Sequence, residues 1–344
     1  MDRIAKNAVV QKSDYTNLFD SFNNLNVLII GDVMVDSYIW GQVNRISPEA
    51  PVPIVAVKQR ENRLGGAANV ALNIKALGAR PILCSVVGDD QKGAEFTGLL
   101  EAEGMESSGI VKSNERITTT KFRVIGNKMQ LLRVDEEDDK ELSSTEFQAL
   151  VSCFDKLVSK EKIDVIIFQD YDKGVISAEL IDHVVAATND RNIPVTVDPK
   201  KKNFGDYKGV SLFKPNLKEL REGLNLSVDP TIANDLNHAA DNLRQLLQSE
   251  IVLITLSEHG IYVDRKINGK HEYHMLPSHV RAVSDVSGAG DTVISVASVC
   301  LASGIGSEEL AFIANLAGGQ VCEKVGVVPV DKMRLMEEVI RLRC

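Results

Sequence analysis

Short apolar segments that recur along the chain constrain its fold more than any other feature. Residues 26–31 run without a charge to a glycine, and similar apolar or β-branched runs follow at intervals. They lie at 81–90, 165–170, 195–198, 211–213 and 251–255. Such runs are typical of strands buried on both faces of a parallel sheet. Helical patterns lie between and after them, near 93–104, 177–191 and 233–248, and over 307–344 apart from 326–329. This alternation predicts an α/β fold with a doubly wound, mostly parallel sheet flanked by helices.

The composition fits one large α/β domain spanning residues 1–344 and narrows the class of partner. The chain has 344 residues, of which 44% are hydrophobic and 25% are charged, and a net charge of −9. Because it is acidic and has no basic block, bulk electrostatics would not hold a nucleic acid, so we expect a small-molecule partner. Its five cysteines are scattered without a C-x-x-C pair, which argues against a disulfide framework and a structural zinc site.

The N-terminal segment has no pattern of export or membrane insertion. Residues 1–22 are polar and of mixed charge, and no apolar run approaches the roughly 20 residues of a membrane span. We therefore expect a cytoplasmic protein without a membrane partner. Up to about Leu25 the sequence predicts a polar helical arm, with Ser13 and Asp14 as its cap.

A turn of small residues passes into an apolar helix within 285–301. Gly288, Ala289 and Gly290 precede Asp291, and the segment after Asp291 is apolar or small, without glycine or proline. The free N–H groups and the dipole of a helix start favour a bound phosphate, which small residues allow to approach. A carboxylate beside such an anion suits a base that acts on an attacking hydroxyl, so Asp291 is a candidate general base of phosphoryl transfer. The alternative is a turn in which Asp291 caps the helix.

A second glycine-rich turn, at 63–79, opens a helix that is expected to close at Gly78. Two β-rich pieces, about 36–58 and 117–135, flank it in the sequence. The first contains three prolines and the second has a Gly-Asn turn, which favour edge strands and a hairpin over helices. Together the two pieces predict a small β sheet that stands off the main domain, with one apolar face that needs a cover.

The two glycine-rich strings, in this order and at this separation, resemble the two signature motifs of the ribokinase-like (PfkB) carbohydrate kinase family. The resemblance implies a ribokinase-like fold, ATP as phosphoryl donor, and a β lid over the sugar that commonly also forms a homodimer surface. It implies that Asp291 is the general base and that Gly288, Ala289 and Gly290 form the anion hole. On the sugar side it implies contacts from Asp36, Gly65, Gly66 and Asn69. The alternative for Asp36 is a turn or cap carboxylate.

Asn216 and Glu219 match the family's N-x-x-E motif. The resemblance implies that they hold Mg²⁺ through water beside the triphosphate, as hard oxygen ligands suit this ion. Taken alone, the same string is an equally good capping box at a helix start. Thr255, Ser257 and Gly260 resemble the family's T-x-G-x-x-G loop beside the nucleotide, with Ser257 in place of the middle glycine.

Four further positions complete the expected nucleotide and cation sites. Asn315 matches a family residue near the adenine, with a helix-surface amide as its alternative, and Lys200 is expected at the nucleotide. Asp285 and Ser287, with backbone from 321–327, resemble a monovalent-cation site found in several relatives. Carbonyls with one carboxylate suit K⁺, so this ion is a further expected cofactor.

Longer strings resemble one branch of the family, the bacterial heptose 7-phosphate kinases of lipopolysaccharide-core precursor synthesis. These strings lie at 31–36, 45–53, 170–174, 197–200 and 255–258. The resemblance implies phosphorylation of D-glycero-D-manno-heptose 7-phosphate at its anomeric hydroxyl, and it adds Asp170 to the sugar site. Many relatives in this branch carry a nucleotidyltransferase domain with an H-x-G-H signature. The chain has no such string, so a stand-alone kinase is expected.

Basic residues in the lid pieces and after strand ends fit a phosphorylated sugar, because guanidinium and ammonium groups bind phosphate. The candidates are Arg45, Lys121, Arg123, Arg133, Lys173 and Lys200. The alternative is that these charges only solvate edge strands. Two rival functions stay open: a kinase for another sugar or sugar phosphate, and a non-catalytic sugar- or nucleotide-binding protein of the same fold. Intact Asp291, Asn216 and Glu219 argue against the second.

Overall fold

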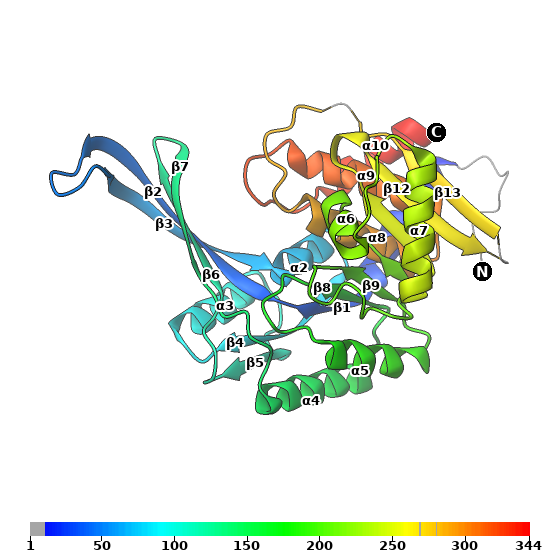
Figure 1. The fold of residues 1–344 in the computed structure, drawn as a ribbon, viewed down its shortest axis with the longest axis horizontal. Helices are drawn as coiled ribbons and strands as arrows, with labels where there is room; N and C mark the ends of the chain where they lie inside the picture. Colours follow the sequence, from blue (N-terminus) through cyan, green and yellow to red (C-terminus); the bar gives the residue numbers. More distant parts are fainter. Residues whose placement is uncertain (1–10, 268–269, 280) are drawn as a thin grey trace.

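The computed structural model describes residues 11–267, 270–279 and 281–344 and contains the predicted large sheet (Figure 1). Its strands are β1 Asn26–Gly31, β4 Arg80–Gly88, β5 Ile110–Ser113, β8 Val165–Gln169, β9 Val195–Asp198, β10 Leu212–Phe213, β11 Ile251–Thr255, β12 Ile261–Ile267 and β13 Lys270–Leu276. Their order is β13-β12-β11-β10-β9-β8-β1-β4-β5. Pairing is parallel from β11 to β5, and β12 and β13 continue the sheet as an antiparallel hairpin. The prediction of a mostly parallel, doubly wound sheet is confirmed.

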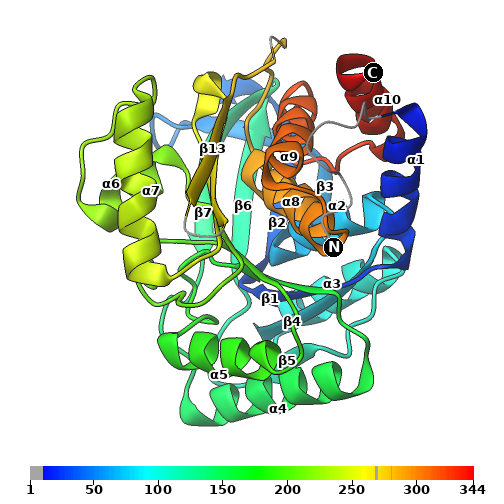
Figure 2. The ribbon, with the colours of Figure 1, turned by 90° about the vertical axis from the view of Figure 1, so that its right-hand side faces the viewer.

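Helices cover both faces of this sheet, which separates two hydrophobic cores. Alternate residues of β1 point to opposite faces, so that Leu28 and Ile30 enter one core while Val27 and Ile29 enter the other. The first core is closed by α4 Ser144–Lys160, α5 Ala178–Asn189, α6 Leu217–Leu224 and α7 Ala233–Leu247. The second is closed by α1 Lys12–Ser21, α2 Ala67–Ala76, α3 Gln91–Ala102, α8 Ala289–Ala302, α9 Ser307–Cys322 and α10 Lys332–Arg343. Figure 2 shows these two helical layers on either side of the strands.

The helix α8 is the most deeply placed of them. Every residue from Asp291 to Cys300 is buried, because the helix is apolar or small all round and packs between α2, α9 and the sheet. None of the helices in the described ranges combines the length and apolar character that a bilayer crossing requires.

A second, four-stranded sheet projects from the main body (Figure 1). Its strands are β2 Val33–Ile46, β3 Pro53–Gly66, β6 Thr120–Gly126 and β7 Met129–Glu136, in the order β3-β2-β6-β7. We call it the lid sheet. It contains both predicted β-rich pieces, and β2 follows β1 after Asp32 alone, so the lid sheet continues directly from the centre of the large sheet. Apolar side chains remain exposed on it, including Met129, Leu132 and Val134 on β7.

Two local predictions need correction. The helix α1 begins at Lys12 with Gln11 as its N-cap residue, so Ser13 and Asp14 lie inside the first turn. Asp14 still contributes, because its carboxylate accepts a hydrogen bond from Gln11 N at 2.8 Å. The part of the predicted arm in residues 1–10 lies outside the described residues. Three further elements were not predicted from the sequence, namely β5, α4 and the hairpin of β12 and β13.

Candidate active site

Asp291 lies in the first turn of α8, and its buried carboxylate is held by three side chains from other elements. Asn69 Nδ2, on α2, donates to Oδ2 at 2.5 Å. The Tyr171 hydroxyl and Gln169 Nε2, at the end of β8, donate to Oδ1 at 2.7 and 3.2 Å. The N-cap residue of α8 is Gly288, and Asp291 does not cap the helix. The capping alternative is therefore wrong for Asp291.

The predicted anion turn, Gly288-Ala289-Gly290, forms the start of α8. Gly288 has φ +77°, a conformation that side-chain-bearing residues rarely adopt, and a Cβ there would lie 3.0 Å from Asn69 Nδ2. A Cβ on Gly290 would lie 3.6 and 3.7 Å from Asp198 Oδ2 and Lys214 Nζ. Glycine at position 288 therefore lets the backbone of the helix start approach Asn69, whereas position 290 has ordinary van der Waals space beside a buried charge pair.

Burial raises the pKa of Asp291 to about 6. The hydrogen bonds from Asn69 and Tyr171 oppose this shift, the Asp198 carboxylate adds to it, and Lys214 opposes it. A carboxylate with this pKa is ionised at neutral pH and has a higher proton affinity than an ordinary Asp, as suits a general base.

Asp198 and Lys214 form a buried ion pair beneath the turn, with Oδ1 and Nζ 3.0 Å apart. Gln169 Nε2 lies 3.4 Å from Asp198 Oδ2 and so bridges Asp198 and Asp291. Sequence reasoning missed Gln169, Tyr171, Asp198 and Lys214 as site residues. Their positions in the sequence could have indicated them, because each lies at the end of a predicted parallel strand or within two residues after it, where functional side chains of α/β sheets gather.

Asp36, for which a sugar contact was expected, lies buried on β2 at the base of the lid sheet. Arg123 Nη1 of β6 donates to its Oδ1 at 2.6 Å. A Cβ on Gly65 would lie 2.5 Å from Asp36 Oδ2, so glycine at this position makes room for the carboxylate. Gly66, the N-cap of α2, has φ +61°, and a Cβ there would lie 2.3 Å from Asp32 O.

Besides Arg123, which pairs with Asp36, three of the predicted phosphate-binding cations pair with carboxylates of β7 or of the residue that follows it. Lys121 Nζ lies 3.2 Å from Asp135 and 3.3 Å from Glu137. Lys173, in the loop after β8, contacts Glu137 at 2.8 Å and so joins the main body to the lid. Arg133 contacts Asp135 through two nitrogens and lowers the pKa of that carboxyl to about 2. Arg45 is exposed towards the outer end of the lid sheet, which separates it from this group.

Asp170 has a different role from the predicted sugar contact. It is 1% exposed, and its Oδ2 accepts hydrogen bonds from Tyr207 OH at 2.7 Å and Asn203 Nδ2 at 3.2 Å. Its Oδ1 accepts from Asp172 N at 2.8 Å. Since buried protein donors occupy both oxygens, Asp170 holds the loop after β8 in place. We correct its assignment from a sugar ligand to a support of that loop.

Asp32 supports the same loop and was also missed. Its carboxylate accepts from the backbone N–H groups of Tyr171, Lys173 and Val175 at 2.8, 3.2 and 3.1 Å. Burial and the neighbouring Asp170 raise the pKa of Asp32 to about 6. Two buried carboxylates thus fix the loop that carries Tyr171 to Asp291.

Asn216 and Glu219 form the capping box that sequence analysis left as an alternative. Asn216 Oδ1 accepts from Glu219 N at 2.8 Å, and Glu219 Oε2 accepts from Asn216 N at 2.9 Å. Glu219 Oε1 is paired with Lys200 Nζ. Burial opposes the charge of Lys200, but Asp198 and Glu219 outweigh it and raise the pKa of that ammonium. Capping does not exclude a role at Mg²⁺, since hard oxygens at a helix start fit a hydrated ion.

Protein side chains alone would not complete the coordination shell of Mg²⁺ at Asn216 and Glu219. Among the described residues, the one set of three close potential ligand side chains is Asp241, Asp264 and His271, on α7 and the β12–β13 hairpin. The guanidinium of Arg244 lies 2.6 Å from Asp264 and already neutralises the charge of that carboxylate. At Asn216 and Glu219, an ion would need water and phosphate oxygens to complete its shell.

The predicted nucleotide loop follows β11. Ser257 has φ +54°, a left-handed conformation that explains why a glycine in the matching family position would fit easily. Gly260 has φ +89°, and a Cβ there would lie 2.1 Å from Leu276 O. Thr255 N donates to Pro215 O at 3.1 Å, which joins this loop to the strand end before Asn216. Asn315 Nδ2, on α9, donates to Pro277 O at 2.9 Å.

Asp285 fastens the segment before the anion turn. Its Oδ1 accepts from Ser287 N and its Oδ2 from Gly326 N, both at 2.9 Å. The structure therefore brings Asp285 beside the 321–327 backbone, with Ser287 in the same turn as Asp285. Burial opposes ionisation of Asp285, but these backbone donors outweigh it and lower its pKa.

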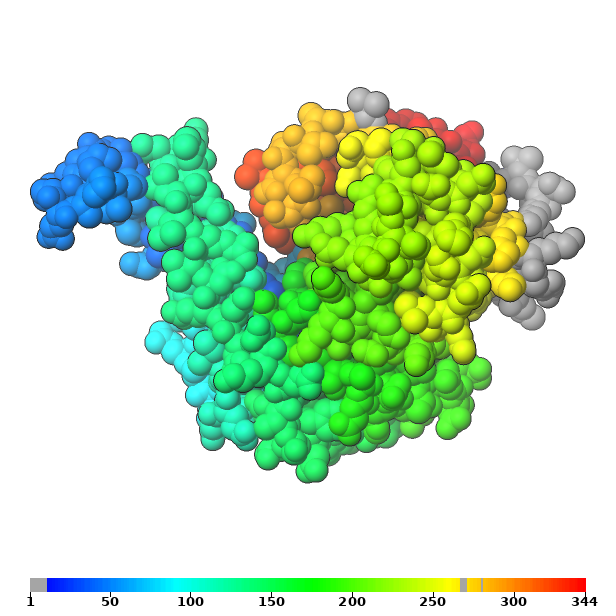
Figure 3. Space-filling model, viewed as in Figure 1, coloured from blue at the N-terminus to red at the C-terminus, as the bar shows by residue number. Residues whose placement is uncertain are grey.

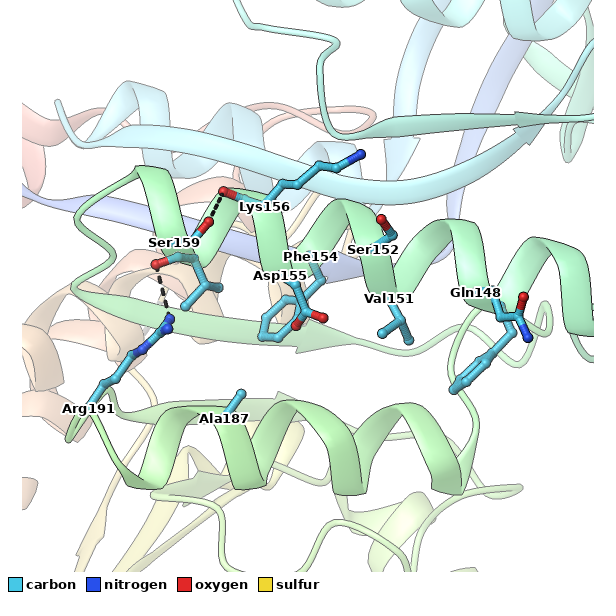
Figure 4. Close-up of a pocket in the computed structure, with 11 residues that line it drawn as sticks. Gln148, Val151, Ser152, Phe154, Asp155, Lys156, Ser159, Ala187 and Arg191 are labelled. Carbon is cyan, nitrogen blue, oxygen red and sulfur yellow. Dashed lines mark hydrogen bonds between the residues drawn. The ribbon is translucent and has the colours of Figure 1, made fainter.

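The molecular surface is hollowed in two separate places. Figure 3 shows a cleft between the lid sheet and the C-terminal segment drawn in orange, and Figure 1 shows α2 and α8 near its inner end. A separate hollow of about 620 Å³ lies between α4 and α5 (Figure 4). Its lining includes Phe147, Val151 and Ala187, with Arg191 donating to Val158 O at its end. None of the residues that hold Asp291 lines this second hollow.

Comparison with known proteins identifies close relatives of the sequence. The sequence model of the pfkB family carbohydrate kinases matches residues 24–332. Bifunctional protein HldE of Citrifermentans bemidjiense is 36% identical over 331 residues, which cover 96% of this chain and 66% of that protein. Bifunctional protein HldE of Methylobacillus flagellatus is 38% identical over 313 residues, which cover 91% and 63%. The chain thus spans slightly less than two thirds of the length of these relatives.

Solved structures share the fold at low sequence identity. Phosphofructokinase-2 from Escherichia coli in complex with potassium has a TM-score of 0.74 at 17% identity, covering 93% of this chain and 99% of that one. Ribokinase from Arabidopsis thaliana complexed with ribose and ATP has a TM-score of 0.68 at 16% identity, covering 91% and 99%. The fold is ribokinase-like. Because the family's sequence model matches most of the chain, this chain belongs to the pfkB family of carbohydrate kinases.

Proposed function

We propose that this carbohydrate kinase transfers the γ-phosphoryl group of ATP to the anomeric hydroxyl of D-glycero-D-manno-heptose 7-phosphate. The product would be the 1,7-bisphosphate, a precursor of ADP-heptose and of the lipopolysaccharide core, made in the cytoplasm. Relatives at 36–38% identity are named bifunctional protein HldE. The choice of acceptor rests on the strings at 31–36, 45–53, 170–174, 197–200 and 255–258, which resemble the heptose 7-phosphate kinases. The observation that carries the chemistry is the hydrogen-bonded, buried Asp291 at the start of α8.

In the proposed reaction Asp291 acts as the general base. Its ionised carboxylate takes the proton of the anomeric hydroxyl as that oxygen attacks the γ-phosphorus. The new O–P bond forms while the bond between the γ-phosphorus and the β,γ-bridging oxygen breaks, and ADP leaves with the electron pair. The start of α8, from Gly288 to Gly290, faces the transferred group and stabilises its charge. Asn69 and Tyr171 keep Asp291 oriented throughout.

Metal ions and lysine side chains are proposed to balance the charge of the ATP phosphates. Asn216 and Glu219 would hold Mg²⁺ through water, and the bound ion would neutralise charge on the phosphates. Lys200, beside Glu219, supplies a fixed positive charge near the same phosphates, and Lys214 supports the anion turn from below. Asp285 and Ser287 with the 321–327 backbone would hold K⁺, a proposal supported by their juxtaposition. Thr255, Ser257, Gly260 and Asn315 would line the nucleotide.

The lid sheet is proposed to hold the sugar phosphate and to pair with a second lid. Asp36 would accept hydrogen bonds from sugar hydroxyls, next to Gly65, Gly66 and Asn69. Lys121 shares Asp135 with Arg133 and Glu137 with Lys173, and Arg123 Nη1 lies 3.4 Å from Lys121 O, which supports a common action of these cations on one phosphate. The exposed apolar side chains of β7 favour a homodimer through this sheet, because such a surface is costly to leave in water.

A phosphoryl-transfer assay on a small acceptor panel tests this proposal. ADP formation is measured with heptose 7-phosphate, dephosphorylated heptose, fructose 6-phosphate and ribose as acceptors. The proposal expects the highest kcat/KM for heptose 7-phosphate. Preference for ribose or fructose 6-phosphate would instead assign another sugar kinase of this family. Binding of ATP and sugar without turnover on any acceptor would favour the non-catalytic alternative.

A further inference from the structure

Gln169 contacts Asp291, the proposed base, but has no role in the proposed transfer of the phosphoryl group. It is the last residue of β8 and is 1% exposed. Its Nε2 donates to Asp291 Oδ1 at 3.2 Å and lies 3.4 Å from Asp198 Oδ2. Its Oε1 is buried and has no hydrogen-bond partner among the described residues.

The orientation of this amide follows from its neighbours. Ionised carboxylates accept hydrogen bonds and donate none, so the NH₂ end of Gln169 faces Asp291 and Asp198. The carbonyl end is left unpaired, which is unfavourable for a buried polar atom. An apolar side chain of the same size would fill the space without this penalty. The contact with the two carboxylates is therefore the feature that distinguishes Gln169 from a simple packing residue.

The backbone fixes where this side chain emerges. Gln169 pairs with Gly31 of β1 on one side and with Asp198 of β9 on the other. A Cβ on Gly31 would lie 1.9 Å from Gln169 O, so glycine is needed for this close approach. Asp32 N donates to Gln169 O at 3.3 Å. Because both neighbouring strands hold the backbone, the amide has a defined position between the two carboxylates.

We propose that Gln169 is a positioning residue that orients Asp291 Oδ1 and sets the pH range in which Asp291 accepts a proton. The proposal rests on the proposed role of Asp291 as the general base. The groups that face Asp291 are Asn69 from α2, Tyr171 after β8, Asp198 from β9 and Lys214 after β10. Among the described residues, Gln169 is the side chain whose hydrogen bonds join Asp291 to Asp198.

Two substitutions separate a positioning role from packing. A donor to an ionised carboxylate favours the charged form, whereas a nearby like charge disfavours it. Gln169→Met keeps the size and removes the donor, so the acid limb of the kcat/KM profile should move to higher pH. Gln169→Glu adds a like charge and should move the limb further, by roughly one pH unit or more. The KM for ATP should stay unchanged in both variants.

Gln148 offers a matched control, because it is an exposed glutamine on α4 beside the second hollow (Figure 4). Gln148→Met and Gln148→Glu should leave the pH profile as in the unmodified enzyme. Identical acid limbs in both Gln169 variants and the unmodified enzyme would overturn the positioning role. Activity in Asp291→Asn would instead overturn the proposed function, so the two failures are distinguishable.

A measurement on the unmodified protein covers the case in which the Gln169 variants do not fold. The side-chain NH₂ signals of Gln169, assigned by NMR, should titrate with the midpoint of Asp291. The same signals should lose this response in Asp291→Asn. Signals that do not change over the range in which Asp291 titrates would overturn the inference without any substitution at Gln169.

Discussion

Asn69 and Asp291 are 222 positions apart in the sequence, yet Asn69 Nδ2 donates to Asp291 Oδ2 at 2.5 Å. This hydrogen bond joins the start of α2 to the start of α8, the two helices that the glycine-rich strings open. Thr292 and Asn73 add a second link one turn further along, with a hydrogen bond of 3.1 Å. The two strings therefore form one site, and each depends on the other for its geometry.

We expect Asp291→Asn to abolish turnover while the fold and ATP binding stay intact. A general base contributes about 10²–10⁴-fold to kcat, and an amide of the same shape cannot replace it. Steady-state assays give kcat, circular dichroism reports the fold, and calorimetry reports ATP binding. Retention of more than about a tenth of the unmodified kcat would be incompatible with a contribution of that size and would remove Asp291 as the base.

The pH dependence of kcat/KM should have an acid limb near pH 6. Burial raises the pKa of Asp291 from its ordinary value of 3.8 to about 6, and the base must be ionised to accept a proton. Activity should thus be constant above the limb and fall about tenfold per pH unit below it. An unshifted Asp would keep full activity at pH 5, so a flat profile down to that pH contradicts this expectation. ATP titrates in the same way in the assay of every variant, so differences between the acid limbs of variants come from the enzyme.

Glu219→Gln should weaken the response to Mg²⁺ without unfolding α6. Glutamine can keep the reciprocal hydrogen bond to Asn216 N, so the cap remains while the charge near the phosphates is lost. Glu219→Ala should lose both the charge and this hydrogen bond, while Asn216 still caps the backbone N–H of residue 219. The stability cost should be about 0.5–1.5 kcal/mol, the usual range for one lost hydrogen bond. Activity as a function of Mg²⁺ concentration and Tm measure the two effects separately.

The capping box of α4 is a matched control for that experiment. Ser143 and Glu146 make the same pair of hydrogen bonds at a helix start outside the proposed nucleotide site. Glu146→Gln should therefore leave the Mg²⁺ response unchanged. Full activity of the unmodified enzyme in excess chelator would show that the reaction does not need the ion.

Substitution of the lid cations should affect phosphorylated and free sugars differently. A lost charge-assisted contact costs about 1.5–3 kcal/mol, so Ala at a true phosphate ligand among Arg123, Lys121 or Lys173 should lower kcat/KM for heptose 7-phosphate about 10–100-fold. The same variant should resemble the unmodified enzyme on dephosphorylated heptose. Glu137→Gln removes the ion pair of Lys173 and one of the two carboxylate partners of Lys121, and it should lower the KM of the phosphorylated acceptor. An equal loss of kcat/KM on both acceptors would show that these cations do not bind the substrate phosphate and only solvate the edge strands of the lid sheet.

Leu132→Glu on β7 should weaken self-association if the lid sheet is a homodimer interface. Leu132 is 55% exposed in one chain, and a charge there would be buried against the partner lid. Sedimentation velocity measures the change. Leu342→Glu on α10 is the matched control, because Leu342 is 46% exposed but lies outside the lid sheet. A monomeric unmodified protein would end the lid-dimer proposal.

The strand and helix pattern and the two glycine-rich turns could be predicted from the sequence because they depend on local properties. Buried parallel strands must be apolar on both faces, as in β1 and β8, and the helix start at Gly288 needs residues without bulk. The lid pieces were visible for the same reason, since prolines and a Gly-Asn turn exclude long helices. The resemblance to a known family then supplied roles for Asp291 and Asp36.

Tertiary structure alone decided which side chains meet. Gln169, Tyr171, Asp198 and Lys214 gather around Asp291 and Gly290 because parallel strands end at the same edge, a distance relationship that no local pattern contains. The same applies to Asp170, whose position after a strand favoured a sugar ligand, but whose oxygens are occupied by Tyr207, Asn203 and Asp172 N. Local sequence determines the strands, the helices and the backbone conformation of the glycine-rich turns. Hydrogen-bond partners and pKa values depend on burial and on the neighbours that the fold brings together.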